Sequence, residues 1–309
     1  MATIDILGVR HAYELTPPTT SPHTLVFIHG WLLSRGYWQP LAERLAPNYQ
    51  CLTYDLRGFG QSQAQPSTKG DSGSTPVPAQ PRSSGDPTTL NSVVTTRYTP
   101  IAYAQDLAVL LQQLNITSAW LIGHSLGGTI ALWGADYLPQ HVKGVICINA
   151  GGGIYLKEAF EQFRLVGQRL LKLRPRWLCQ LPLIDLALTR TSVASPIARC
   201  WGRQRLIDFV QAAQEAALGT LLDSTTEEEV NRLPQVVSQL KQPVYFLAGA
   251  LDPIMEPKYV RHLASFHPLF QAACGANVIE IPQCGHLAMV EQPDVVARQI
   301  CSILAMHKG

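Results

Sequence analysis

Charged residues are scarce in this chain of 309 residues: Asp, Glu, Lys and Arg make up 15%, and the formal net charge is only +2. A chain so close to neutrality lacks the strong positive charge typical of nucleic-acid binding, so we expect no nucleic-acid partner. No apolar run reaches the roughly 20 residues that a membrane-spanning helix needs. These absences favour a globular protein without a transmembrane segment.

Signs of a secreted or metal-dependent protein are also missing. The seven cysteines are scattered and odd in number, without a Cys-x-x-Cys pair, which favours reduced thiols over a disulfide framework. No His-Glu-x-x-His or similar ligand spacing occurs, so we expect neither a metal nor another cofactor. The first residues, Met1-Ala2-Thr3-Ile4-Asp5, have no basic segment ahead of an apolar one. We therefore expect a cytoplasmic protein.

What the chain does contain is a regular alternation of apolar runs and helical stretches, with 46% hydrophobic residues. Strands are expected at 24–28, 118–122, 144–148, 243–249 and 277–281, and helices at 100–114, 126–138 and 293–306. Strands that alternate with helices favour a mostly parallel sheet with helices on both faces. The sequence therefore predicts a doubly wound α/β fold.

The most informative motif is Gly123-His124-Ser125-Leu126-Gly127, of the form Gly-x-Ser-x-Gly, between an expected strand and an expected helix. In that setting the serine occupies a strained turn that exposes its hydroxyl above the sheet. A serine needs a base to become a nucleophile, and the base needs an acid that orients it. Asp252 and His286 each follow a later expected strand, in the order Ser-Asp-His. We therefore predict a catalytic triad of Ser125, Asp252 and His286.

Acyl transfer through a serine also requires two backbone N–H groups that stabilise the oxyanion of the intermediate. The N–H of Leu126, directly after the nucleophile, is one candidate. The N–H of Trp31, after His29-Gly30 at the end of the first expected strand, is the other. We also expect Trp31 and His124 to bind substrate, because both lie next to these catalytic groups in the sequence.

These motifs together resemble the α/β-hydrolase superfamily, in its branch of small serine esterases and thioesterases, over nearly the whole chain. The resemblance is carried by His29-Gly30-Trp31, residues 54–62, 123–128 and 249–252, and Gly285-His286 with Glu291-Gln292-Pro293. It implies the α/β-hydrolase fold with an inserted helical lid. Dehalogenases and epoxide hydrolases of the superfamily usually carry an aspartate at the nucleophile position, so Ser125 argues against both activities.

Several of these residues also have structural interpretations. Asp252 precedes a proline and could instead cap a helix. A competing acid could have followed the preceding strand, but Asn149 stands there. We expect His29 to support the turn His29-Gly30-Trp31, which we call the oxyanion turn. We expect Cys284, two residues before His286, to pack in the core.

Two segments depart from the minimal fold, which leaves a core of 1–150 and 242–309. Residues 63–90 are mostly Gly, Pro, Ser, Thr, Ala and Gln without apolar periodicity, which predicts a disordered insertion. Residues 151–241 occupy the lid position of the superfamily and are expected to be helical. Their first part, 151–206, has ten basic and three acidic residues. Such a lid is either an ordinary solvated surface or a site for an anionic partner: an acidic acyl carrier, coenzyme A or an anionic membrane surface.

The sequence thus predicts a serine hydrolase that cleaves small-molecule carboxylic esters or thioesters through an acyl-enzyme. The apolar lid favours substrates with an apolar acyl or prenyl part. Other chemistry with the same triad remains open: carbon–carbon bond hydrolysis, cofactor-free perhydrolysis and lyase reactions. A methylesterase for carrier-bound acyl chains, a chlorophyll or pheophytin dephytylase and a non-catalytic small-molecule receptor remain open as well.

Overall fold

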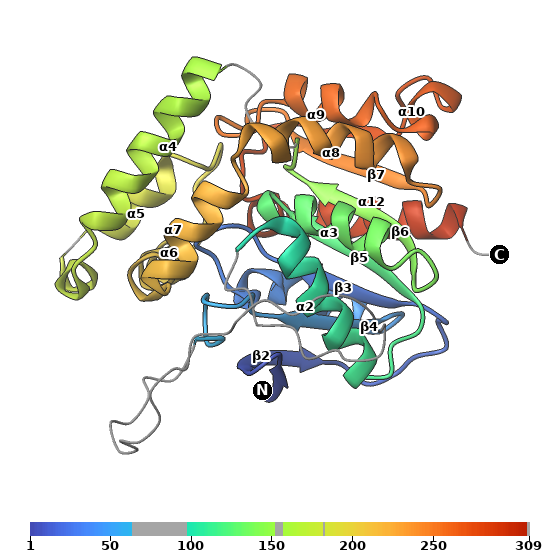
Figure 1. Cartoon of the computed structure of the whole chain (residues 1–309), viewed down its shortest axis with the longest axis horizontal. Helices are drawn as coiled ribbons and strands as arrows, with labels where there is room; N and C mark the ends of the chain where they lie inside the picture. The colour runs from blue at the N-terminus through green and yellow to red at the C-terminus, as the bar shows by residue number, and fades with distance from the viewer. Residues whose placement is uncertain (64–97, 152–156, 182, 308–309) are drawn as a thin grey trace, which may run out of the picture.

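The computed structural model describes residues 1–63, 98–151, 157–181 and 183–307. The insertion expected at 63–90 lies outside these residues except for Gln63. The described chain builds one sheet with helices on both faces and a group of helices at one side (Figure 1).

Eight strands form the sheet in the order β1-β2-β4-β3-β5-β6-β7-β8. The pairs β1–β2 and β2–β4 are antiparallel, and all other neighbours are parallel. The strands are β1 (Ala2–Ile6), β2 (Val9–Leu15), β3 (Thr24–Ile28), β4 (Gln50–Tyr54), β5 (Ala119–His124), β6 (Val142–Ile148), β7 (Val244–Gly249) and β8 (Val278–Ile281). The predicted mostly parallel sheet is confirmed, and β1, β2 and β4 extend it beyond the strands expected from sequence.

The two faces of the sheet carry separate hydrophobic cores. Along β3, Leu25 and Phe27 belong to one core and Val26 and Ile28 to the other, because side chains alternate along a strand. The first core includes residues of α1 (Gln39–Leu45) and α12 (Pro293–Met306), and the second includes residues of α2 (Pro100–Gln113), α3 (Leu126–Tyr137), α8 (Glu227–Gln239) and α9 (Pro257–Ala264). Burial on both faces explains why the central strands are continuously apolar.

Local sequence explains where two of the expected helices begin. Pro100 and Pro293 stand in the first turn of α2 and α12, where the N–H that proline lacks would have no helical partner. The Thr99 hydroxyl caps α2 by accepting the N–H of Ala102 at 3.2 Å. Three short elements complete the core: η1 (Arg35–Trp38), α10 (Pro268–Ala272) and α11 (Ala288–Glu291).

The connection from β6 to β7 is largely helical. It contains α4 (Lys157–Lys172), η2 (Arg176–Gln180), α5 (Ile184–Arg190), α6 (Arg199–Gln211) and α7 (Gln214–Asp223), followed by α8. Figure 1 shows α6 and α7 near the sheet and α4 and α5 as the outermost layer at the left. Within the described part of the chain, no helix has both the length and the apolar character to cross a bilayer.

Candidate active site

Ser125 stands in the turn between β5 and α3, with φ 52° and ψ −120°, a backbone conformation that residues other than glycine rarely adopt. Tight packing surrounds this turn. A Cβ on Gly123 would lie 2.1 Å from the carbonyl oxygen of Gly127, and a Cβ on Gly127 would lie 2.1 Å from that of Ile28. Glycine is required on both sides, which is the physical reason for the Gly-x-Ser-x-Gly motif. Ser125 itself is partly exposed at the carboxyl end of a central strand.

Asp252 and His286 meet from the loops that follow β7 and β8. Asp252 Oδ2 lies 2.8 Å from His286 Nδ1, and Asp252 Oδ1 accepts the N–H groups of Ile254 and Met255 at 2.8 and 2.9 Å. Burial favours a raised pKa for Asp252, but His286 and the two N–H groups outweigh it and hold the pKa below its usual value. A carboxylate can only accept a hydrogen bond, so Nδ1 carries the proton of this contact, and Nε2 is the other ring nitrogen.

Asn149, which follows β6, holds the same carboxylate from another side. Its Nδ2 donates to Asp252 Oδ2 at 2.7 Å and to the carbonyl oxygen of Gly285 at 3.1 Å. Asn149 is completely buried and has φ 50°. Sequence reasoning noted this residue only as the absence of a second acid. Its position directly after a central strand was the signal that it belongs to the site.

Glu291 fixes the loop that carries His286. Its Oε2 accepts the N–H groups of Gly285 at 2.9 Å and Ala194 at 2.8 Å, and its Oε1 accepts that of Leu287 at 3.0 Å. The sequence interpretation placed Glu291 only near the start of the final helix. The structure adds that its carboxylate holds three backbone donors around the proposed base, one of them on the β6–β7 connection.

His124 lies beneath the site, with only 1% of its surface exposed. Its Nε2 donates to the carbonyl oxygen of His286 at 2.8 Å, and the two rings lie 4.7 Å apart at 61°. Burial and the neighbouring His286 lower the pKa of His124 to about 3, so its ring is neutral near pH 7. So little exposed surface does not fit the predicted contact with substrate. The observed contact is with His286 instead.

This buried histidine should make the folded protein sensitive to acid. Below the ordinary pKa of 6.5 the unfolded state binds a proton at this histidine, whereas the folded state does not until about pH 3. The free energy of unfolding therefore falls as the pH drops through that range. We expect His124→Gln to reduce the slope of unfolding free energy between about pH 6 and pH 4 by roughly 1.4 kcal/mol per pH unit, measured by urea unfolding. His141→Gln, at an exposed position, serves as the control. Equal slopes for His124→Gln and the parent protein would contradict this expectation.

The His29-Gly30-Trp31 turn lies against the serine turn. A Cβ on Gly30 would lie 3.3 Å from Ser125 Cβ, so glycine allows the two turns to approach closely. His29 is completely buried, and its Nε2 accepts the N–H of Leu56 at 2.9 Å, in keeping with the supporting role expected for it. This proximity brings the backbone of the turn to Ser125.

Leu126 and Trp31 directly follow the two residues that approach there, Ser125 and Gly30. Leu126 is the first residue of α3, and the N–H groups in the first turn of a helix have no carbonyl partner within the helix. The Trp31 indole donates from Nε1 to the carbonyl oxygen of Ala217 on α7 at 2.9 Å. A Cβ on Gly167 of α4 would lie 3.5 Å from the same indole. The Trp31 side chain therefore joins the turn to two helices of the β6–β7 connection.

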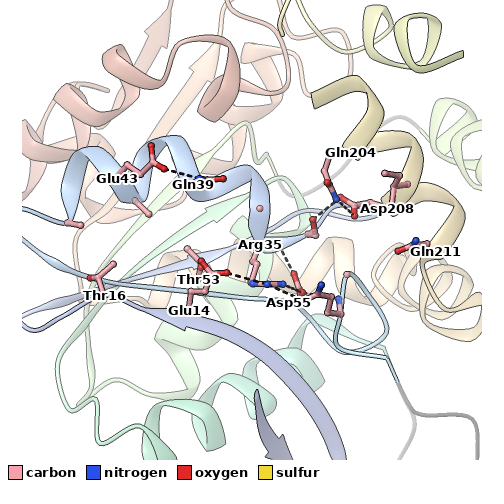
Figure 2. Close-up of a pocket in the computed structure, with 17 residues that line it drawn as sticks. Glu14, Thr16, Arg35, Gln39, Glu43, Thr53, Asp55, Gln204, Asp208 and Gln211 are labelled. Carbon is pink, nitrogen blue, oxygen red and sulfur yellow. Dashed lines mark hydrogen bonds and ion pairs between the residues drawn. The ribbon is translucent and has the colours of Figure 1, made fainter. Parts of the chain in front are cut away.

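A separate polar cavity of about 570 Å³ lies among β2, β4, α1 and α6 (Figure 2). At its wall Arg35 Nη1 lies 2.5 Å from Asp55 Oδ2, and the Ser34 hydroxyl donates to Asp208 Oδ2 at 2.8 Å. Burial raises the pKa of Asp208 to about 7. None of the predicted triad residues lines this cavity. Its contacts tie the β6–β7 connection to the loop that follows the oxyanion turn.

Neither a reactive thiol nor a cluster of metal ligands is found among the described residues of the site. Cys284 is completely buried, and burial raises the pKa of its thiol to about 12, so it does not form a thiolate near pH 7. Among the described residues, no group of three or more His, Cys, Asp or Glu side chains is placed to hold a metal ion. The described contacts join Asp252, His286, Asn149 and His124, and His124 directly precedes Ser125 in the chain.

The chain belongs to the α/β-hydrolase fold family, whose model matches residues 23–293. It is therefore an enzyme of the α/β-hydrolase class. It is 29% identical to a pimeloyl-[acyl-carrier protein] methyl ester esterase of Xanthomonas axonopodis pv. citri, over 87% of this chain and 92% of that protein. It is 25% identical to a 2-succinyl-6-hydroxy-2,4-cyclohexadiene-1-carboxylate synthase of Serratia proteamaculans, over 91% and 92%. A thermophilic esterase from Thermogutta terrifontis shares the fold, with a TM-score of 0.69, 22% identity and 99% of each chain covered.

Proposed function

We propose that this enzyme cleaves carboxylic esters or thioesters through an acyl-enzyme. The observation that carries the proposal is the 2.8 Å contact between Asp252 and His286, together with Ser125, which is held at φ 52° and directly follows His124, whose ring packs against that of His286. These groups supply the nucleophile, base and orienting acid that serine hydrolysis requires. Similarity to esterases supports the same chemistry.

In the first half of the proposed reaction, the Ser125 hydroxyl attacks the substrate carbonyl while His286 Nε2 takes its proton. The N–H groups of Trp31 and Leu126 stabilise the resulting oxyanion. His286 then gives the proton to the departing alcohol or thiol, and the acyl group remains on the serine. In the second half His286 activates a water molecule, which releases the acid and restores the serine. Asp252 holds the imidazole and stabilises its charged form throughout.

We further propose that the core consists of 1–150 and 242–309, and that 151–241 is a lid over the site. Two contacts support this division. Trp31 is bound by Ala217 of α7, and the backbone N–H of His286 donates to the carbonyl oxygen of Ser192 at 2.7 Å. The lid residues thus hold both the oxyanion turn and the loop of the base. An apolar acyl or prenyl group would lie between Trp31 and the lid.

In place of a substrate contact, we assign His124 the role of positioning His286. The support is its hydrogen bond to the His286 carbonyl together with the contact between the two rings. Asn149 has a similar role toward Asp252.

A second candidate is cleavage of a methyl ester on a carrier-bound acyl chain. The similarity to the Xanthomonas esterase over 92% of that protein favours it. The triad chemistry would be unchanged, and only the alcohol and the carrier would differ. The Serratia relative, named a synthase, keeps other chemistry with the same groups open for this chain.

Hydrolysis of p-nitrophenyl esters from acetyl to palmitoyl, with matched acyl thioesters, tests the proposed function. We expect release of p-nitrophenol with a preference for medium or long chains, because an apolar pocket gains binding energy with each buried methylene. The Ser125→Ala variant provides the background rate. A folded protein that hydrolyses no member of either series would overturn the proposal for general ester cleavage. Activity only on a carrier-bound methyl ester would select the second candidate.

A further inference from the structure

Helix α4 turns an apolar side toward solvent. Leu165, Val166 and Leu170 are 52–54% exposed, and Leu173, just after the helix, is 74% exposed. The side that faces the protein includes Gly167 and Leu171, the latter only 2% exposed. A surface helix of a globular protein normally shows the reverse orientation, with its apolar side toward the core.

The exposed apolar side chains continue beyond this helix. Among the described residues, eight of the fourteen exposed large hydrophobic side chains fall within 165–186. They form what we call the α4–α5 apolar surface: Leu165, Val166, Leu170, Leu173, Trp177, Leu181, Leu183 and Leu186. Figure 1 shows α4 and α5 as the outermost helices, farthest from the sheet. Contiguous exposed apolar patches mark interaction sites in soluble proteins, which makes this part of the chain the candidate for one.

Basic side chains are interleaved with these apolar ones. Arg169, Lys172, Arg176 and Arg190 are all exposed. Within residues 161–190 the only acidic residues are Glu161 and Asp185. Asp185 is buried and pairs with Arg199 at 2.8 Å. The surface is therefore both apolar and positively charged.

We propose that the α4–α5 apolar surface docks the enzyme on an anionic lipid bilayer. The leucines and Trp177 would enter the interface, and the basic side chains would contact headgroup phosphates. A second copy of the chain is disfavoured because it would bring like charges together. An acidic carrier protein would match the charge, but a bilayer accommodates both the charge and eight apolar side chains.

The position of the surface also connects it with the site. Gly167 lies on the inward side of α4 next to the Trp31 indole, while Leu165, Val166 and Leu170 of the docking surface are exposed on the same helix. Docking would place the lid at the lipid bilayer, where apolar esters dissolve. This consequence rests on the proposed function, but binding to the bilayer does not, so the two can fail separately.

Vesicle flotation tests the docking directly. The full chain with Ser125→Ala, which cannot consume lipid, is mixed with phosphatidylcholine vesicles containing about 30 mol% phosphatidylglycerol, and separately with pure phosphatidylcholine. We expect binding to the anionic vesicles, weaker binding to the neutral ones, and release from the anionic vesicles at about 0.5 M salt.

Two sets of substitutions separate the apolar and ionic contributions. Leu165→Gln, Leu170→Gln and Leu173→Gln together should weaken partitioning by on the order of tenfold per leucine. Arg169→Gln, Lys172→Gln and Arg176→Gln together should weaken it by about fivefold per residue, on anionic vesicles only. Exposed residues elsewhere provide matched controls, Phe266→Gln with Met306→Gln and, for charge, Lys143→Gln, and these should bind as the parent does. Circular dichroism verifies that each variant is folded.

Three results would overturn the proposal. The first is binding to anionic vesicles that is no stronger than binding to neutral ones. The second is an equal loss of vesicle binding in the surface variants and in their controls. The third is a different occupant. It would be shown by self-association in sedimentation that the leucine variants abolish, or by binding of an acidic acyl carrier protein without binding of vesicles.

Discussion

Replacement of Ser125 by alanine should lower kcat for ester hydrolysis by roughly 10⁴- to 10⁶-fold. In the proposed mechanism the hydroxyl forms the acyl-enzyme, whereas the oxyanion donors and the pocket remain in the variant and give a small residual rate. The backbone should tolerate the change because alanine adds no atoms to a turn whose packing already holds φ at 52°. Steady-state hydrolysis of the preferred p-nitrophenyl ester measures the loss.

Covalent labelling with a fluorophosphonate probe provides an independent readout of the same prediction. The parent protein should be labelled, and Ser125→Ala should not. Ser238→Ala, at an exposed position on α8, is the matched control and should keep both labelling and activity. Activity in Ser125→Ala equal to that of the control would exclude the acyl-enzyme mechanism. A folded parent protein that is neither labelled nor active would support a non-catalytic receptor.

Asp252→Asn should reduce kcat by about 10⁴-fold while the protein stays folded. An amide in place of the carboxylate cannot stabilise the imidazolium, and it can present a donor to Nδ1, which favours the wrong tautomer of His286. The change should affect kcat much more than KM, because Asp252 is 3% exposed and contacts the base rather than the substrate. A loss of less than tenfold would assign the acid role to another residue.

Asn149 offers a sharper version of this test. Its Nδ2 lies 2.7 Å from the Asp252 oxygen that also contacts His286. We expect Asn149→Asp combined with Asp252→Asn to recover at least about tenfold over Asp252→Asn alone, since it restores one carboxylate and one amide to the same buried site. Asn149→Asp alone is the control and should be impaired, because two carboxylates would share one buried position. No recovery in the double variant would show that the carboxylate must approach His286 from the loop after β7.

Much of the core could be predicted because its signals are local. The continuous apolar runs predicted the strands β3, β5, β6, β7 and β8, and the helix expected at 293–306 is α12 (Pro293–Met306). The strands β1 and β2 were missed because an antiparallel pair at one end of the sheet, solvated on much of its surface, lacks such runs. The contact of Asp252 with His286 followed from strand order, since carboxyl ends of parallel strands lie at one edge of the sheet.

The sequence by itself determined the kinds of groups at the site and their order: glycines that permit a strained turn, a serine within it, and an aspartate and a histidine after two later strands. Only the tertiary structure decided which further residues hold those side chains in place. It turned His124 away from solvent toward His286, brought Asn149 to Asp252, and directed Glu291 to the loop of the base. It also turned the apolar side of α4 outward. Helical periodicity specifies which residues share a side, but which side is buried depends on the neighbours that pack there, and those neighbours are distant in the chain.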